Sequence, residues 1–294
     1  MRSIDGAPRP EAAGGSSDDE VRRRVESFGH SHVGHVRSAN EDHFVVASLQ
    51  RSVQLRQTNL DDRGIFDRLC GPMAYLFAVA DGVGGVAGGR LASSMAVQSI
   101  VHYLSETVGS YHAVPPGLEH EFLDPLGAAV QRAHDALLRA FGDQTRGGPA
   151  TTLTMALLVW PRAFLVHVGD SRVYHWRDGT LQRLTRDQTM GAYLVAQRAM
   201  SEDQAERAGL NNVLSSAIGA ADMTPWVGSL DLAPGDALLL CTDGLTMHVP
   251  DDAIAATLGA TTDPEAACHT LVDAALAAGG RDNVTAIVVR ALSA

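Results

Sequence analysis

The sequence predicts an α+β layered fold, because short apolar runs occur in bursts and helical periodicity appears between the bursts. The runs expected to form strands span 44–49, 75–80, 151–160, 164–168, 173–176, 237–241 and 284–290. The segments with helical periodicity span 89–108, 124–141 and 264–278. Turn signals at Pro161-Arg162 and Asp178-Gly179 leave little chain between neighbouring runs, which favours antiparallel pairing of the strands.

Composition divides the chain into a tail and one domain. Residues 1–27 are rich in Gly, Ser, Pro and charged side chains and have almost nothing to bury, so we expect a disordered tail. Residues 28–294 contain no Pro- or Ser-rich linker and are expected to form a single domain. Apolar residues make up 45% of the 294-residue chain, enough for a sizeable core. Residues 186–220 are polar and irregular with short helical patches, which predicts a surface flap.

Charge and cysteine content exclude several classes of function. The 23 basic and 34 acidic residues give a formal net charge of −11, which disfavours a nucleic-acid partner. Every basic residue is arginine, which excludes Schiff-base lysines and the P-loop lysine. The three cysteines lie far apart and form no CxxC pair, as is typical of free thiols in a reducing compartment. No apolar run approaches the roughly 18 residues of a membrane span, so we expect a cytoplasmic protein without a membrane partner.

Acidic residues stand where predicted strands begin or end. They are Glu41 and Asp42 before 44–49, Asp81 after 75–80, Asp170 after 164–168, Asp243 after 237–241, and Asp282 before 284–290. A single Asp-Gly pair is most simply a turn whose carboxylate accepts backbone N–H groups. Several such placements in one chain favour a different interpretation, because carboxylates brought together repel and divalent cations offset that repulsion. An all-oxygen set of this kind suits Mg²⁺ or Mn²⁺ rather than Zn²⁺.

Five motifs around these carboxylates occur in a defined order. They are Arg37-Ser38-Ala39-Asn40-Glu41-Asp42, Asp81-Gly82-Val83-Gly84-Gly85, Gly169-Asp170-Ser171-Arg172, Thr242-Asp243-Gly244 and Gly280-Arg281-Asp282-Asn283-Val284-Thr285. The ordered set resembles that of the metal-dependent Ser/Thr protein phosphatases of type 2C, in their bacterial branch, over about residues 28–291. The resemblance implies two stacked antiparallel β-sheets flanked by α-helices, a four-layer sandwich with a dinuclear metal centre at one end.

The resemblance also implies the ligands of two metal ions. Asp81 would bridge both ions, and the carbonyl oxygen of Gly82 would bind the second. Asp243 and Asp282 would hold the first ion. The cofactors expected on this basis are two Mn²⁺ or Mg²⁺ ions.

Further roles are implied for residues around that pair of ions. Asp42, with Glu41 beside it, would act directly or through metal-bound water. Asp170, together with Asp243, matches the site of a third ion in bacterial members. Arg37, four residues before Glu41, matches the arginine that binds the substrate phosphate. The residues expected to be catalytic are therefore Arg37, Asp42 and Asp81.

The chemistry expected of such a site is phosphate-ester hydrolysis without a covalent intermediate. Two cations lower the pKa of a bridging water, which makes a metal-bridging hydroxide available to attack phosphorus in line. The Arg37 guanidinium can bind two phosphate oxygens at once. The sequence thus predicts a Mg²⁺/Mn²⁺-dependent protein-serine/threonine phosphatase acting on phosphorylated proteins. By resemblance, its partners would include a cognate Ser/Thr kinase, and we expect a monomer.

Two rival functions use the same residues. One is a catalytically weak regulatory module that keeps the phosphatase fold and binds a partner protein. The other is a hydrolase of small phosphate esters with the same metals. Loss of a core aspartate would favour the regulatory module, and none is lost.

Some positions depart from the family pattern. Val83 stands where many members have a histidine that is a suggested general acid, Arg90 stands where glutamate is usual, and Gln188 replaces a common histidine. Residues 50–75 form a longer connection than the usual hairpin.

Several residues also have simpler interpretations. The alternating histidines at 30, 32, 35 and 43 could be the polar face of a strand rather than metal ligands. Arg37 could be an ordinary surface charge, and Asp170-Ser171-Arg172 a structural turn with an internal ion pair. Thr151 and Thr152 are most simply strand residues. Asp251 and Asp252 are expected to cap a following helix.

Overall fold

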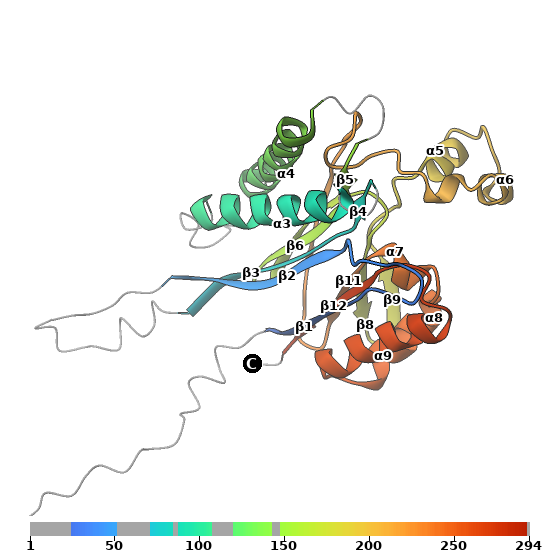
Figure 1. Ribbon diagram of the computed structural model, residues 1–294. Helices are drawn as coiled ribbons and strands as arrows, with labels where there is room; N and C mark the ends of the chain where they lie inside the picture. The colour runs from blue at the N-terminus through green and yellow to red at the C-terminus, as the bar shows by residue number, and fades with distance from the viewer. Residues whose placement is uncertain (1–24, 52–70, 85–87, 108–119, 143–147, 293–294) are drawn as a thin grey trace, which may run out of the picture.

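Two five-stranded antiparallel sheets lie face to face between layers of helices in the computed structural model (Figure 1). The structure describes residues 25–51, 71–84, 88–107, 120–142 and 148–292. The first sheet has the order β1 (Val25–His32), β12 (Val284–Ala291), β11 (Ala237–Cys241), β8 (Arg172–Arg177) and β9 (Thr180–Arg183). The second has the order β10 (Trp226–Asp231), β7 (Arg162–Val168), β6 (Leu153–Val159), β3 (Gly71–Ala80) and β2 (His43–Arg51). A short ribbon pairs β4 (Gly82–Val83) with β5 (Ala150–Thr151).

Helices cover the outer faces of the sheets. The long helices α3 (Gly88–Thr107) and α4 (His120–Phe141) pack on the second sheet, whereas α8 (Asp251–Ala260) and α9 (Pro264–Ala277) pack on the first with the one-turn α7 (Asp243–Thr246). The predicted two-sheet sandwich with flanking helices is confirmed. None of the helices in the described ranges is long and apolar enough to cross a membrane.

Central strands are buried on both faces, which explains their nearly continuous apolar sequences. In β3, Phe77 and Val79 face the core between the two sheets, whereas Leu76 and Ala78 face α3 and α4. In β11, Leu238 faces the core between the sheets. All the strands predicted from apolar runs are present, although the run 151–160 is divided between β5 and β6.

Four of the strands in the described ranges were not predicted, namely the two-residue β4 and three strands at sheet edges. β1, β9 and β10 are the outer strands of their sheets, so one long side of each is unpaired. β10 alternates exposed with half-buried side chains, and β9 is mostly exposed. Apolar runs do not mark such strands, because their side chains have little to bury. The β8–β9 hairpin instead follows from Asp178-Gly179, where φ values of 49° and 82° suit a type I′ turn.

The predicted domain boundary needs one correction. Residues 25–27, assigned to the tail, belong to β1 and pair with β12. The remainder of that predicted tail, 1–24, lies outside the described residues. In the connection predicted over 50–75, the first two residues end β2 and 71–75 belong to β3, while 52–70 lie outside the described residues.

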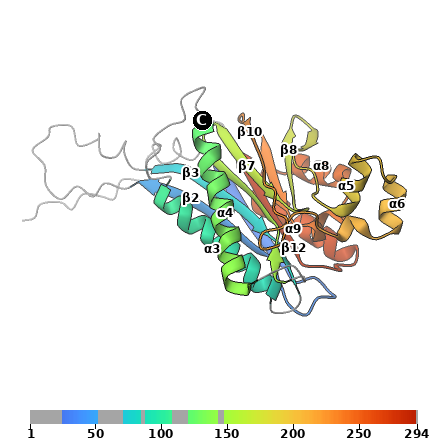
Figure 2. The same ribbon diagram turned by 90° about the horizontal axis from the view of Figure 1, so that it is seen from above.

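The predicted flap contains α5 (Met190–Ala196), α6 (Glu202–Arg207) and the 3₁₀ turn η2 (Leu210–Asn212). Figure 2 shows α5 and α6 apart from α3 and α4, on the other side of the sheets. Ser201 caps α6 with a capping box, in which its hydroxyl accepts from the Gln204 N–H and the Gln204 side chain accepts from the Ser201 N–H. Short helices that are stabilised by side-chain caps explain why helical patches occur in the polar segment 186–220.

Antiparallel registers bring the acidic motifs to one end of the sandwich. His43 at the start of β2 lies opposite Ala80 at the end of β3, and Cys241 at the end of β11 lies opposite Ala286 near the start of β12. Residues just beyond these positions therefore converge. They are Glu41, Asp42, Asp81, Asp243 and Asp282.

Candidate metal centre

A cleft of about 1080 Å³ opens at this end of the sandwich. Seven of the eight predicted site residues line it, namely Arg37, Glu41, Asp81, Gly82, Asp170, Asp243 and Asp282. The eighth, Asp42, is buried beneath the cleft with 5% of its surface exposed. The structure thus brings together all eight predicted site residues at one end of the sandwich.

Asp42 is held from the opposite sheet. Its Oδ2 accepts hydrogen bonds from the hydroxyls of Thr242 (2.9 Å) and Thr285 (2.6 Å), which lie beside β11 and in β12. Its Oδ1 is buried and has no hydrogen-bond partner among the described residues. Burial, aided by repulsion from Asp243, raises the pKa of Asp42 to about 7 against the opposing effect of the two hydroxyls.

The backbone of Asp81 is fixed by two threonines. The Asp81 N–H donates to Thr152 Oγ1 (2.9 Å), and the Asp81 carbonyl accepts from Thr151 Oγ1 (2.8 Å) and from the Thr152 N–H (2.9 Å). Burial, followed by repulsion from Asp42 and Asp243, raises the pKa of the Asp81 carboxyl well above its ordinary value. Sequence analysis missed this role of the threonines, because nothing local distinguishes them from ordinary strand residues.

Asp243 and Asp170 complete the acidic wall. Burial and the charge of Asp282 raise the pKa of Asp243 to about 6, and burial and the charge of Asp243 raise that of Asp170 to about 8. Asp243 begins α7, where Gly244 passes so close to the next strand that a Cβ would lie 2.0 Å from the Asn283 carbonyl oxygen. Only glycine allows this approach.

Arg37 contacts one of the predicted metal ligands. Its Nη2 donates to Asp282 Oδ2 at 2.6 Å, and 55% of its side chain remains exposed in the cleft. The bond raises the pKa of Arg37, so the guanidinium stays charged. Arg37 is therefore part of the site rather than an isolated surface charge.

Asn283 ties together the loop that carries Arg37 and Glu41. Its Nδ2 donates to the carbonyls of Val33 (2.9 Å) and Ala39 (3.0 Å), and its Oδ1 accepts from the Glu41 N–H (2.8 Å). The Asn283 side chain is buried and uses both ends of its amide. Sequence reasoning placed this residue in a motif without assigning it a role.

We expect Asn283→Ala to lower kcat/KM for phosphate-ester hydrolysis by about 10- to 100-fold, because a small displacement of the groups that act on the substrate slows a reaction strongly. It also leaves two carbonyls and one N–H without their partner, so the melting temperature should fall. Steady-state kinetics and thermal melts would measure both effects. Gln98→Ala, which removes an exposed side-chain amide from α3, is the matched control. Unchanged kcat/KM in Asn283→Ala would contradict the positioning role.

The donor set fits a hard divalent cation. Glu41 Oε1, Asp42 Oδ1 and Asp243 Oδ1 are buried oxygens without a hydrogen-bond partner among the described residues, which is costly unless a cation binds them. Within the same ranges, no group of three or more His, Cys, Asp or Glu side chains could hold an ion by itself. A cation here would therefore also need other oxygen ligands, such as the Gly82 carbonyl and water.

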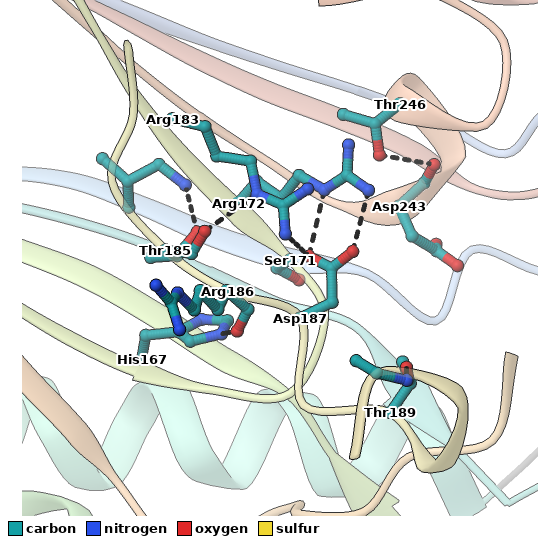
Figure 3. Close-up of polar contacts among 12 residues, drawn as sticks. His167, Ser171, Arg172, Arg183, Thr185, Arg186, Asp187, Thr189, Asp243 and Thr246 are labelled. Carbon is teal, nitrogen blue, oxygen red and sulfur yellow. Dashed lines mark hydrogen bonds and ion pairs between the residues drawn. The ribbon is translucent and has the colours of Figure 1, made fainter. Parts of the chain in front are cut away.

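Asp187, near the start of the flap, binds two arginines of the neighbouring strands. Figure 3 shows the guanidinium groups of Arg172 and Arg183 turned toward its carboxylate. Arg172 binds it through two hydrogen bonds of 3.0 and 2.8 Å, and Arg183 lies 3.2 Å away. The internal ion pair considered for Asp170-Ser171-Arg172 is therefore absent, because Arg172 pairs with Asp187 instead.

A buried polar network links the acidic site to the flap. The Thr152 hydroxyl contacts that of Ser171 (3.0 Å), and the Thr154 hydroxyl contacts the Ser171 carbonyl (3.3 Å) and His167 Nδ1 (2.8 Å). His167 Nε2 then donates to the carbonyl of Arg186 (3.0 Å), where the flap begins. Burial lowers the pKa of His167 to about 4, so its ring is neutral at pH 7.

The departures from the family pattern have structural counterparts. Gln188 links the start of the flap to the segments on either side of it. Its Oε1 accepts a hydrogen bond from the Gly169 N–H (2.9 Å), and its Nε2 donates one to the Thr224 carbonyl (3.0 Å). Val83 lines the cleft and is exposed, and it has no proton to donate. Arg90 lies in the first turn of α3 and is also exposed.

The histidines and the predicted helix caps fit the simpler interpretations in part. His30 and His32 lie in β1, and His43 Nδ1 contacts the Ser93 hydroxyl (2.9 Å).

Asp251 and Asp252 lie in the first turn of α8, but the N-cap position is Pro250. Asp251 instead accepts a hydrogen bond from the Tyr174 hydroxyl (2.9 Å).

Comparisons with known proteins agree with this geometry. Residues 51–278 match a family model described as Protein phosphatase 2C. The serine/threonine protein phosphatase PstP of Mycobacterium tuberculosis is 34% identical over 218 residues, which are 73% of this chain and 40% of the relative. The chain thus spans about 40% of the length of that relative. The serine/threonine phosphatase stp of Listeria monocytogenes serovar 1/2a is 28% identical over 240 residues, 80% of this chain and 91% of the relative.

Solved structures show the same architecture. A crystal structure of the M. tuberculosis serine/threonine phosphatase PstP/Ppp matches with a TM-score of 0.70 and 29% identity, over 92% of this chain and 99% of the other. A structure of the PstP catalytic domain in complex with two manganese ions matches with a TM-score of 0.68 and 29% identity, over 92% and 99%.

Proposed function

The chain belongs to the protein phosphatase 2C family, and on that premise we propose that it is a metal-dependent protein-serine/threonine phosphatase. The observation that carries the proposal is the set of buried, unpartnered carboxylate oxygens on Glu41, Asp42 and Asp243 next to Arg37. Curated relatives named as serine/threonine phosphatases support it, as does the similar structure with two manganese ions. The alternative of a regulatory module is not favoured, because no predicted ligand is missing.

The ligand roles proposed here are those that the resemblance to the family implies. Asp81 would serve both ions, the Gly82 carbonyl would bind the second ion, and Asp243 and Asp282 would hold the first. Asp42 would act beside Glu41 directly or through water. Asp170, facing Asp243, would serve a third ion. Bound Mg²⁺ or Mn²⁺ would supply Lewis-acid catalysis, by activating water and neutralising charge on the phosphate.

Arg37 would orient the phosphate. A guanidinium has five N–H donors in a planar fork, and the bond to Asp282 uses only one of its nitrogen atoms. The Arg37 side chain lines the cleft and is 55% exposed, so its remaining N–H groups are available to bind two phosphate oxygens together. The Asp282 bond fixes the direction of the fork, because it restricts the rotation of a long side chain.

Further expectations concern the organisation and setting of the protein. We infer one catalytic domain, since a single apolar cluster packs between the two sheets. A cytoplasmic location is supported by Cys241 and Cys268, which are both buried and free. Phosphoproteins, among them a cognate Ser/Thr kinase, are the partners proposed from the resemblance to the family. The proposed oligomeric state is a monomer.

Hydrolysis of a phosphothreonine peptide and of p-nitrophenyl phosphate tests the function directly. Each substrate is assayed with Mn²⁺, with Mg²⁺ and with EDTA. We expect turnover of both substrates that requires the metal. Turnover of p-nitrophenyl phosphate alone would favour the small-ester hydrolase, and no turnover by folded, metal-loaded protein would favour the regulatory module.

A further inference from the structure

A second cleft of about 1350 Å³ adjoins the acidic one beneath the flap. Its walls come from α5, α6 and the segment that leads into them, and from the loops at the ends of α7 and α9. Asp170, Asp243, Met247 and Arg281 line both clefts, so the two spaces meet there. A peptide bound at the acidic site could therefore extend into this second space.

The cations of the two clefts are not equivalent. They are Arg37, Arg172, Arg183, Arg186 and Arg281. Arg37 pairs with Asp282, and Arg172 and Arg183 share Asp187. No ion pair with a described carboxylate is found for Arg186 or Arg281. Of these two, Arg281 alone lines both clefts, so it is the available cation that a substrate spanning the two spaces would meet.

The loop that presents Arg281 is fixed on both sides. The Arg281 N–H donates to His248 Nε2 (3.2 Å), and the carbonyl of Gly280 accepts from the His35 N–H (2.7 Å). Gly279 and Gly280 adopt φ values of 130° and 51°, which suit glycine and allow the sharp exit from α9. The guanidinium is therefore an exposed charge on a rigid support rather than on a mobile tip.

The remaining charges of the second cleft limit where an anion can bind. Glu202 and Glu206 line it from α6, at the outer end of the flap. They would repel an anion there. At the end shared with the acidic cleft, Arg281 would attract an anion once cations bound at the acidic site offset the charges of Asp170 and Asp243, which also line that end. An anionic group of a bound peptide is thus favoured at the end of the second cleft that adjoins the proposed site of hydrolysis, and is disfavoured at the other end.

We propose that Arg281 is a specificity-determining residue, which binds a second anionic group of the substrate a few residues from the scissile phosphate. This inference rests on the proposed function, because it places the first phosphate at Arg37. The second group would be a carboxylate side chain or another phosphate, which share the chemistry that a guanidinium recognises. The substrates preferred would be phosphoprotein segments that are acidic or multiply phosphorylated.

Matched phosphothreonine peptides test this inference. One series carries a single Glu at successive positions on either side of the phosphothreonine, a second carries another phosphothreonine there, and a third carries Gln. Turnover is measured as kcat/KM with Mn²⁺, and binding is measured separately, also with Mn²⁺, by fluorescence anisotropy of non-hydrolysable phosphonate analogues of the same peptides. We expect the wild-type protein to favour one anionic series over Gln by about two- to fivefold, the range of an exposed ion pair. The favoured series distinguishes a carboxylate from a phosphate.

Three variants assign the preference to Arg281. Arg281→Gln should bring the ratio of kcat/KM between anionic and Gln peptides to about 1. Arg281→Glu should reverse the preference, so that the Gln peptides are favoured. Arg207→Gln, which removes a charge from an arginine on α6 that is 82% exposed, should keep the wild-type ratio. A wild-type protein without preference, or an unchanged ratio in Arg281→Gln, would overturn the inference. Preserved binding preference without any turnover would instead refute the proposed function alone.

Discussion

Asp81→Asn is expected to reduce kcat by about three powers of ten or more while raising the melting temperature of the metal-free protein. The loss of turnover follows because Asp81 is the proposed ligand of both ions, and several kcal/mol of transition-state stabilisation correspond to such a factor. The gain in stability follows because Asp81 is buried among Asp42, Asp243, Asp170 and Asp282, whose charges repel it. Opposite effects on rate and stability distinguish a functional carboxylate from a structural one.

The two effects of Asp81→Asn are measured by kinetics with saturating Mn²⁺ and by thermal melts in EDTA. Asp203→Asn is the matched control, because Asp203 is an aspartate on α6 whose side chain is 80% exposed. The control should change neither quantity. Near-normal kcat in Asp81→Asn would refute the metal assignment, and a lower melting temperature would indicate that Asp81 mainly supports the fold.

The metal-free protein is expected to lose stability as the pH rises from about 4 to about 8. Burial and mutual repulsion raise the pKa of Asp243 to about 6, of Asp42 to about 7 and of Asp170 to about 8. The unfolded carboxyls titrate near 3.9, so between these values the folded state binds more protons than the unfolded state. Stability is then fully present below about pH 4 and is lost as the pH rises through the folded pKa values.

Thermal melts across this range, in EDTA and with Mn²⁺, provide the measurement. We expect the melting temperature in EDTA to fall by about 5 °C or more, and Mn²⁺ to restore it at the upper end. Mn²⁺ affinity should rise over the same range, because the carboxyls must lose protons before they bind the ion. A melting temperature in EDTA that rises between pH 5 and pH 8 would contradict the coupling of these carboxylates.

The sequence predicted the parts of the fold that depend on local composition. Central strands such as β3 and β11 are buried on both faces, so their apolar runs identify them. The edge strands β1, β9 and β10 are held mainly by backbone hydrogen bonds to one neighbour, which any sequence can make. The carboxylates of the candidate metal centre could be found because each one adjoins a strand.

The supporting residues of the site could not be found in this way. Thr152 matters because it meets Asp81, which lies 71 residues earlier, and Asn283 because it meets a loop more than 240 residues earlier. The simpler interpretation of its motif would pair Arg172 with a neighbour in the sequence, yet Arg172 binds Asp187 at the start of the flap. Contacts of this kind arise only when the sheets are assembled, and no local pattern in one sequence records them.

The acidic cleft lies on the seam between the two sheets, and this has a consequence for how the protein comes to act. Asp42, Asp81 and Asp170 adjoin strands of one sheet, whereas Asp243 and Asp282 adjoin strands of the other. Neither half of the sandwich carries the whole set, and Asp42 accepts hydrogen bonds from threonines of the opposite half. If the proposed function holds, a chain leaving the ribosome would therefore be inactive until β12 has joined its sheet, and activity would report that the two sheets have assembled.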